Sequence, residues 1–266
     1  MNKFTYALAL GAGLALGVAS PSARASALVQ NLSPASLSAA QFNADFASTT
    51  GVLTQNYSVA NTPTTGVVQS QVFQGTGQYA GLTAYAYEFG VNNVSDSTGQ
   101  PTYLNSAAMQ FGSTPTPTTI NGQNSSVFVI NDGPVGSLNV PQAAPGSTIQ
   151  VPASVAWQPG TTTGSLTFQY LDPTTNAGPL QAGATGGTIV VITNDKNLTT
   201  PQVSIQNPNP QVGPYPVAFA PTGGTISSVP QGSETGTPEP ATIIGWTSVL
   251  GALALVRRVR RRGAAA

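Results

Sequence analysis

The run Gly81-Leu82-Thr83-Ala84-Tyr85-Ala86-Tyr87-Glu88-Phe89-Gly90-Val91 is the clearest structural signal in the chain. Side chains alternate between the two faces of an extended strand. One face would therefore carry Tyr85, Tyr87 and Phe89 with Thr83 and Val91, and the other Leu82, Ala84, Ala86 and Glu88. An aromatic face that repeats every second residue is typical of a β-strand that lines a core.

Similar short runs precede and follow this strand in the sequence, separated by Gly, Pro, Asn, Asp and Thr. They are Gly66–Gln74, Tyr103–Phe111, Val127–Ile130, Thr148–Val151, Val155–Trp157, Ser165–Tyr170, Thr188–Thr193, Val203–Ile205 and Val217–Phe219. Turn signals at this spacing predict an all-β fold, an antiparallel β-sandwich of about nine or ten strands. Only Ser36–Ala47, with Leu37, Ala40 and Ala44 as its apolar positions, suggests a helix.

Charge is scarce between the two ends of the chain. From Ser26 to Gly236 there are seven acids and one base, Lys196, so this body carries a net charge of −6. Nucleic acid is not an expected partner, because phosphate binding needs basic side chains. Sheet edges in such a body would have few charges to protect them, so self-association is a further expectation.

The chain contains no cysteine and no histidine. Disulfides are therefore excluded, as are the commonest general base and the usual zinc ligands. No phosphate-binding or dinucleotide motif occurs, and we expect no cofactor and no enzymatic activity. A glycosidase is the most serious catalytic alternative, and it would need two facing carboxylates, for which Glu88 and Asp172 are the candidates.

Two Asn/Asp clusters, around Asp96 and around Asp195, have the oxygen ligands that calcium prefers. Neither cluster has the spacing of a known calcium loop, and Asx turns are the alternative interpretation. The face formed by Tyr85, Tyr87 and Phe89 is either core or a platform for stacking sugars, and core is favoured, as it is for Trp157. Tyr57 and Tyr79 lie in polar surroundings and are expected to be more exposed.

The N-terminus has the pattern of a secretory signal peptide, predicted for residues 1–25. A lysine at position 3 precedes the apolar run Phe4–Val18, and Ala23 and Ala25 form the small-residue pattern that signal peptidase reads. The mature chain would start at Ser26, or after Ala27 as a second choice. An uncleaved N-terminal anchor is the alternative.

The C-terminus has three parts: Pro238-Glu239-Pro240, an uncharged segment from Ala241 to Val256, and a basic cluster. The cluster consists of Arg257, Arg258, Arg260, Arg261 and Arg262. As a helix the segment would span about 24 Å and could cross a bilayer once, and the arginines would keep this end in the cytoplasm. The predicted organisation is signal peptide, ectodomain 26–220, Pro/Gly-rich stalk 221–236, sorting signal 237–262 and tail 263–266.

This layout resembles the PEP-CTERM sorting signal, over about thirty of the 266 residues. The resemblance implies processing at the Pro-Glu-Pro motif by an exosortase-like membrane enzyme after transient insertion in the inner membrane. It further implies delivery to the cell surface or the extracellular matrix, often with exopolysaccharide. A structural or adhesive role follows from this resemblance, with a carbohydrate-binding module as the alternative. An ordinary single-span anchor is the other interpretation of the tail.

Overall fold

The computed structural model of the chain describes residues 28–59, 64–92, 103–139, 149–171, 177–181, 183, 185–206, 216–223 and 226. Contacts divide the chain into two compact units, Met1–Val229 and Pro230–Ala266, and every described residue belongs to the first. The predicted signal peptide and the sorting signal lie outside the described residues. In the part that is described, no helix is long and apolar enough to cross a membrane.

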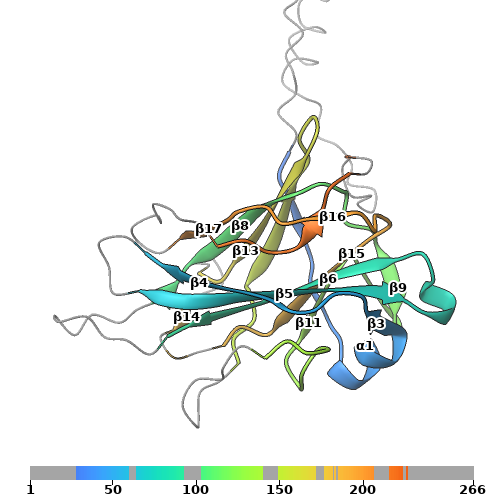
Figure 1. The fold of residues 1–266 in the computed structure, drawn as a ribbon, viewed down its shortest axis with the longest axis horizontal. Coiled ribbons are helices and arrows are strands. Elements are labelled where there is room, and N and C mark those ends of the chain that lie inside the picture. Colours follow the sequence, from blue (N-terminus) through green and yellow to red (C-terminus); the bar gives the residue numbers. More distant parts are fainter. Residues whose placement is uncertain are drawn as a thin grey trace, which may run out of the picture. The chain divides into compact units, whose positions relative to one another are not determined.

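The largest sheet has seven strands, and the aromatic stretch from Gly81 to Val91 supplies one of its inner strands (Figure 1). Its order is β2-β11-β15-β6-β5-β3, and β4 also pairs with β5. The strands are β2 (Ala35–Ser36), β3 (Phe46–Ser48), β4 (Leu53–Ser58), β5 (Thr65–Gly75), β6 (Thr83–Val91), β11 (Val127–Ile130) and β15 (Thr188–Thr193). All pairs in it are antiparallel except β2 with β11.

A second, five-stranded sheet has the order β1-β12-β13-β8-β17, and all its pairs are antiparallel. Its strands are β1 (Gln30–Leu32), β8 (Ser106–Phe111), β12 (Ser154–Gln158), β13 (Gly164–Gln169) and β17 (Val203–Gln206). Three small ladders complete the described strands: β9 (Thr118–Ile120) with β10 (Gln123–Ser125), β7 (Tyr103–Leu104) with β14 (Leu180–Gln181), and β16 (Leu198–Thr199) with β18 (Ala220–Pro221). The all-β prediction is confirmed.

Side chains from both larger sheets meet in one hydrophobic cluster. The predicted aromatic face of β6 is fully buried there, and Phe168 of β13 packs against it, with ring centroids 5.4 Å from Tyr87 and 5.5 Å from Phe89. Trp157 is also fully buried. The prediction that these aromatic residues are core is therefore confirmed, and they are not available as a sugar platform.

A second hydrophobic cluster covers the opposite face of the seven-stranded sheet. Here Ala84 and Ala86 of β6 lie beneath helix α1 (Ala39–Asp45), the 3₁₀ turn η1 (Gly77–Tyr79) and the segment 131–139. Strands β6 and β15 are consequently buried on both faces. The small Ala side chains leave room for Phe42 and Phe73, whose rings meet edge to face with centroids 5.0 Å apart.

Several predictions need correction. The helix is shorter than predicted: Ser38 caps it through a bond from Gln41 N to its Oγ of 3.2 Å, and Phe46 leaves it in an extended conformation. It buries Ala39 and Phe42, whereas the predicted apolar positions Ala40 and Ala44 are exposed. Eighteen short strands are described where nine or ten were predicted.

Two other predictions were wrong. Tyr57 and Tyr79 were expected to be exposed, yet both are buried, with 4% and 7% of their surface accessible. The predicted strand Thr148–Val151 is only a parallel bridge between Gln150 and Gly186 in its described part. Two backbone hydrogen bonds join Gln150 to the segment that precedes β15. Gly187 N donates to the Gln150 carbonyl, and Gln150 N donates to the Thr185 carbonyl.

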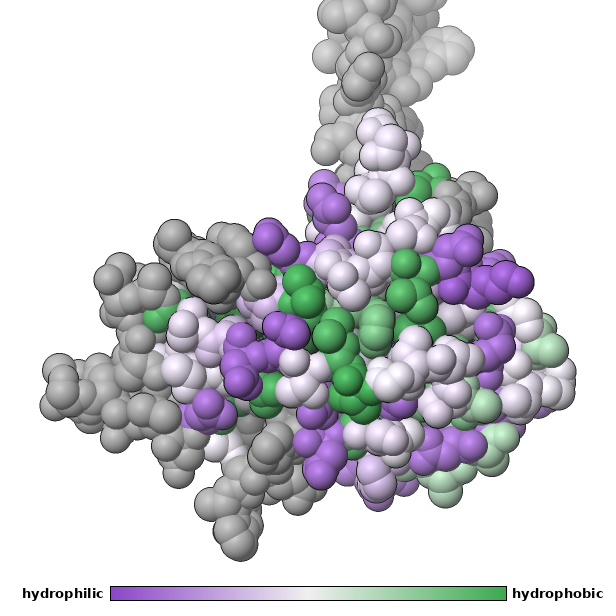
Figure 2. Space-filling view, in the orientation of Figure 1, coloured by the Kyte–Doolittle hydropathy of each residue, from purple (hydrophilic) through white to green (hydrophobic). Residues whose placement is uncertain are grey.

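The surface mixes polar and apolar residues. Figure 2 shows one face of the molecule, on which near-neutral and hydrophilic residues surround a band of hydrophobic ones across the middle. Serine, threonine and glycine give the near-neutral colour, and apolar atoms form much of the surface of any folded protein. This face therefore combines polar groups that can form hydrogen bonds with an exposed apolar band.

Candidate functional site

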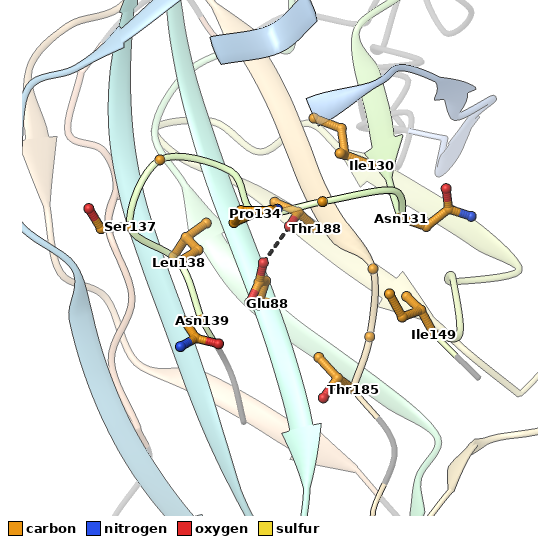
Figure 3. Close-up of a pocket in the computed structure, with 14 residues that line it drawn as sticks. Glu88, Ile130, Asn131, Pro134, Ser137, Leu138, Asn139, Ile149, Thr185 and Thr188 are labelled. Atoms are coloured by element: carbon orange, nitrogen blue, oxygen red, sulfur yellow. Dashed lines mark hydrogen bonds between the residues drawn. The ribbon is translucent and has the colours of Figure 1, made fainter. Parts of the chain in front are cut away.

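The candidate site is a cleft of about 620 Å³ over the outer face of the seven-stranded sheet. Its floor is formed by Glu88 of β6 and Thr188 of β15 (Figure 3). Segment 131–139 forms one wall, and Ile149 with residues 185–187 forms the other. The lining mixes the amides and hydroxyls of Asn131, Ser137, Asn139 and Thr185 with the apolar side chains of Ile130, Pro134, Leu138 and Ile149.

The first wall is fixed to β5 by two glutamines. Gln71 Oε1 accepts a hydrogen bond of 3.0 Å from Ser137 N, and Gln69 Oε1 accepts one of 2.8 Å from Asn139 N. Both glutamines point to the same side as Phe73, because they are separated from it by two and four residues along the strand. The polar positions of β5 thus hold an irregular segment above the sheet, where its backbone groups would otherwise lack partners.

Helix α1 holds the other end of the same segment. Asn43 donates to Pro134 O at 3.0 Å and accepts from Gly136 N at 3.0 Å. Asp132 accepts from Ala39 N at 2.8 Å, which satisfies a free amide in the first turn of the helix. Val135 and Leu138 are buried in the second cluster. This wall is therefore held by β5, by helix α1 and by the second hydrophobic cluster.

Gly136 is required at the bend of this segment. Its φ of +56° is in the left-handed region that favours glycine. A Cβ at this position would lie 2.6 Å from Gln71 Oε1 and from the Phe73 ring. Any side chain here would push the segment away from β5 and change the shape of the cleft.

Glu88 is the one charged residue that is buried among those described, with 6% of its surface accessible. Thr188 Oγ1 donates a hydrogen bond to its Oε1. Figure 3 places its carboxylate between Leu138 and Asn139 on one side and Ile149 and Thr185 on the other. A carboxylate in this position is costly to bury unless hydrogen bonds compensate it, which makes it a candidate for ligand recognition.

The second wall rests on glycine backbone. Gly186 N donates to Phe89 O at 2.7 Å, and Gly187 N donates to Gln150 O at 2.7 Å. Beneath this wall lies Tyr170, whose hydroxyl is only 2.5 Å from where a Cβ on Gly186 would be. Burial, and then the charges of ionised Tyr57 and Glu88, raise the pKa of Tyr170 well above its ordinary value. Its buried hydroxyl has no hydrogen-bond partner among the described residues.

We expect Tyr170→Phe to leave stability unchanged or to raise it by up to about 1 kcal/mol, since it removes a buried hydroxyl that makes no bond. Tyr87→Phe is the matched control, because the Tyr87 hydroxyl donates to Phe219 O at 2.8 Å and its loss should cost about 1 kcal/mol. Urea unfolding of both variants is the measurement. A loss of stability in Tyr170→Phe as large as that in Tyr87→Phe would mean that the Tyr170 hydroxyl does have a partner.

Of the two sequence-predicted catalytic acids, the structure locates only Glu88. Glu88 is the single acid among the described residues that line the cleft, and Asp172, its proposed catalytic partner, lies outside the described residues. Asp132 is engaged at the helix. One carboxylate surrounded by amides and hydroxyls can accept hydrogen bonds from a polar ligand. Two-carboxylate chemistry would require a second acid at the cleft.

Of the two calcium candidates, the structure describes only the cluster around Asp195. Asp195 accepts hydrogen bonds from Asn197 N at 3.0 Å and from Gly223 N at 3.1 Å, which is the geometry of an Asx turn. Asp96 lies outside the described residues. Among the residues that are described, no three His, Cys, Asp or Glu side chains come together as metal ligands would.

The targeting residues cannot be located in the same way. Ala23, Ala25, the Pro238-Glu239-Pro240 motif and the five arginines lie outside the described residues. Near the predicted stalk, the described chain remains bonded to the body as far as Gly223, through Gly112 N to Pro221 O at 3.0 Å and Thr222 N to Asn197 O at 3.0 Å.

A second, shallower groove of about 540 Å³ lies on the outer face of the five-stranded sheet. It is lined by Ala108, Met109, Gln110, Ser165, Pro201, Gln202 and Ser204, none of which is charged. Sequence analysis did not identify it, although polar and large apolar residues alternate in Ser165–Tyr170, a signal that could have indicated which residues face outward.

Comparisons with protein-family models, with curated proteins and with solved structures found no match to this chain.

Proposed function

We propose that this chain is the precursor of an exported protein of the cell surface or extracellular matrix, released from the membrane by an exosortase-like enzyme. Its body would be a β-sandwich ectodomain with a non-catalytic structural or adhesive role linked to exopolysaccharide. The observation that carries the proposal is the C-terminal order of Pro238-Glu239-Pro240, uncharged segment and arginine cluster, in a chain that starts like a signal peptide.

The character of the body supports this role. On the outer face of the five-stranded sheet, Asn31, Ala156, Thr167, Ala108 and Ser204 are directly paired in one row across all five strands. All five side chains are at least partly exposed, and none of the five strands contains a charged residue. Such a face suits hydrogen bonding to a neutral polymer and is indifferent to salt.

The test is the intact mass of the native protein from membrane, cell-surface and medium fractions. We expect a surface or medium form that begins near Ser26 and ends at or near Pro238 to Pro240. Replacing Glu239 with Ala should cause the longer, membrane-bound form to accumulate, whereas Glu234→Ala, just outside the motif, should not. A native protein that always retains Arg257 to Arg262 would instead be an ordinary anchored ectodomain.

Carbohydrate binding is the second candidate function, and the Glu88 cleft favours it. A buried carboxylate beside amide and hydroxyl groups is suited to accepting hydrogen bonds from sugar hydroxyls. If a neutral polysaccharide binds there, Glu88→Gln should weaken binding roughly 10- to 100-fold, the effect of losing a charge-assisted hydrogen bond. Asp45→Asn removes an acid elsewhere and is the control.

Retention of the protein on columns of immobilised neutral polysaccharide measures this effect. Equal retention of wild type and Glu88→Gln would show that the polysaccharide does not bind at the Glu88 cleft. The same Glu88→Gln variant tests the weaker third alternative, glycoside hydrolysis, which would have to disappear with it.

A further inference from the structure

Strand β4 forms an edge of the seven-stranded sheet. Its six residues, Leu53 to Ser58, pair with Ser70 to Thr65 of β5 on one side. No strand in the described part of the chain pairs with its other side, and Figure 1 shows β4 beside β5 at the border of the sheet. Backbone donors and acceptors along such a border are a template for another strand.

The remaining edges of the two larger sheets are shorter or partly covered. Strands β1 and β3 have three residues each, and β2 has two. The free side of β17 is met by the segment 216–218, through Val203 N to Pro216 O at 2.7 Å and Ala218 N to Pro201 O at 3.3 Å. Among the described strands, β4 is thus the longest edge open to pairing.

Strand β4 also lacks the usual protection against pairing. Its sequence, Leu53-Thr54-Gln55-Asn56-Tyr57-Ser58, contains no charged residue, no proline and no glycine. Thr54, Asn56 and Ser58 are exposed to solvent. Soluble proteins commonly place lysine or proline on such an edge to prevent association, and here neither is present.

The strand is held in place before any partner arrives. The Tyr57 hydroxyl donates to Gly90 O at 3.1 Å, and its ring lies against Gly66, where a Cβ would collide with it. At the other end, Gln69 donates to Thr54 Oγ1 at 3.1 Å. Because β4 is already fixed in extended form, pairing costs little additional conformational entropy.

We propose that two copies of this protein associate through β4, antiparallel and about a two-fold axis, so that their seven-stranded sheets continue into one another. A copy of the same strand is the partner that fits, since the edge is uncharged and its own side chains place no like charges opposite one another. To keep each face of the sheet continuous, the axis must pass between two copies of the same residue, and an axis at Gln55 or Asn56 gives the longest overlap of the two strands.

The strength of this contact follows from its size. Two six-residue strands alone bury less than the roughly 1,000 Å² of a stable interface, so the dimer should be weak in dilute solution. It would form where the protein is concentrated, as on a membrane or in a matrix. The inference does not depend on how the C-terminus is processed.

Cysteine cross-linking of the full chain tests the proposal, because the natural sequence has no cysteine. Gln55→Cys and Asn56→Cys each place one thiol at a possible two-fold axis. Opposite residues in antiparallel strands have Cα atoms about 4.5 to 5.5 Å apart, within the range that a disulfide can bridge. Gln158→Cys, exposed on β12 of the other sheet, is the matched control.

After mild oxidation of cells that express each full-length variant, we expect a covalent dimer from Gln55→Cys or Asn56→Cys, at roughly ten times the yield of the Gln158→Cys control. Adding Thr54→Lys to the reactive variant should reduce the yield several-fold, because two lysines would then lie across the edge. Equal yields from all three single variants, or a yield that Thr54→Lys does not change, would overturn the proposal.

Discussion

At roughly pH 11 to 13 we expect this protein to unfold in one cooperative step, because buried tyrosines cannot ionise while it remains folded. The three residues responsible are Tyr57, Tyr87 and Tyr170, each with at most 4% of its surface accessible. Burial is the main cause that raises the pKa of all three well above the ordinary value of 10.0.

Neighbouring acidic groups add to this effect. Tyr85, when ionised, further raises the pKa of Tyr87, and Tyr57 and Glu88 do the same for Tyr170. The pKa of Tyr85 is raised too, by burial and then by the charge of Asp195, and its hydroxyl donates to the carbonyls of Asp195 and Asn197. Tyr85 therefore adds to the effect in the same direction.

The sign of the effect follows from proton linkage. Below pH 10 the three tyrosines are neutral in both the folded and the unfolded state, so they give stability no pH dependence. Above pH 10 the unfolded chain loses these protons while the folded protein keeps them, and stability falls by about 1.4 kcal/mol per pH unit for each tyrosine. Three tyrosines give about 4 kcal/mol per unit, against a usual total of about 5–15 kcal/mol.

Urea unfolding at a series of pH values measures this slope directly, and ultraviolet absorbance of the phenolate shows when the protons leave. Tyr170→Phe should reduce the slope above pH 10 by about 1.4 kcal/mol per unit. Gradual ionisation of all eight tyrosines near pH 10 in a protein that keeps its circular dichroism would show that the buried phenols are accessible to water.

The second large effect is expected at Gly164. This residue begins β13, opposite Phe111 of β8, and the indole of Trp157 lies directly over its Cα. A Cβ at this position would overlap the ring. Because Trp157 is fully buried and meets Phe111 edge to face at 6.2 Å, the indole has no space into which to move. Gly164→Ala should therefore cost roughly 3 kcal/mol of stability.

Two controls make the result specific. Gly51 has no positive φ and nothing within 4 Å of the place that a methyl group would occupy, so Gly51→Ala should stabilise the protein by about 0.4–1 kcal/mol. Combining Gly164→Ala with Trp157→Phe should recover part of the lost stability, because the smaller phenyl ring leaves room for the new methyl group. Thermal unfolding of the four proteins is the measurement, and a Gly164→Ala variant as stable as wild type would contradict the packing described.

The strands that line the central core could be predicted because their sequence alternates. Tyr85, Tyr87 and Phe89 recur every second residue, so all three side chains lie on the same face of one strand. The hairpin at Asn121-Gly122 was missed although the signal was present: both residues have positive φ, as a two-residue turn between β9 and β10 demands. Glu88 was named only as one of two acids that a glycosidase would need, and its place in the floor of the cleft was not predicted.

The rest of the site could not be predicted, because its walls depend on contacts between distant segments. Ser137 and Asn139 reach the cleft only through bonds to Gln71 and Gln69, which lie 66 and 70 residues earlier. Tyr57 was misjudged for the same reason. Its neighbours in sequence are polar, but its ring is buried by Gly66 and Gly90 across the sheet.

Segment 131–139 shows that regular secondary structure is a poor guide to rigidity in this molecule. It contains no helix or strand, only two bends and a turn, yet side chains from α1 and β5 bind its backbone, and two of its own apolar side chains reach into the core. To lift it, several hydrogen bonds and a hydrophobic contact would have to break together. This wall of the Glu88 cleft is therefore held in place before any ligand arrives, and a ligand that enters must fit against a preformed surface there.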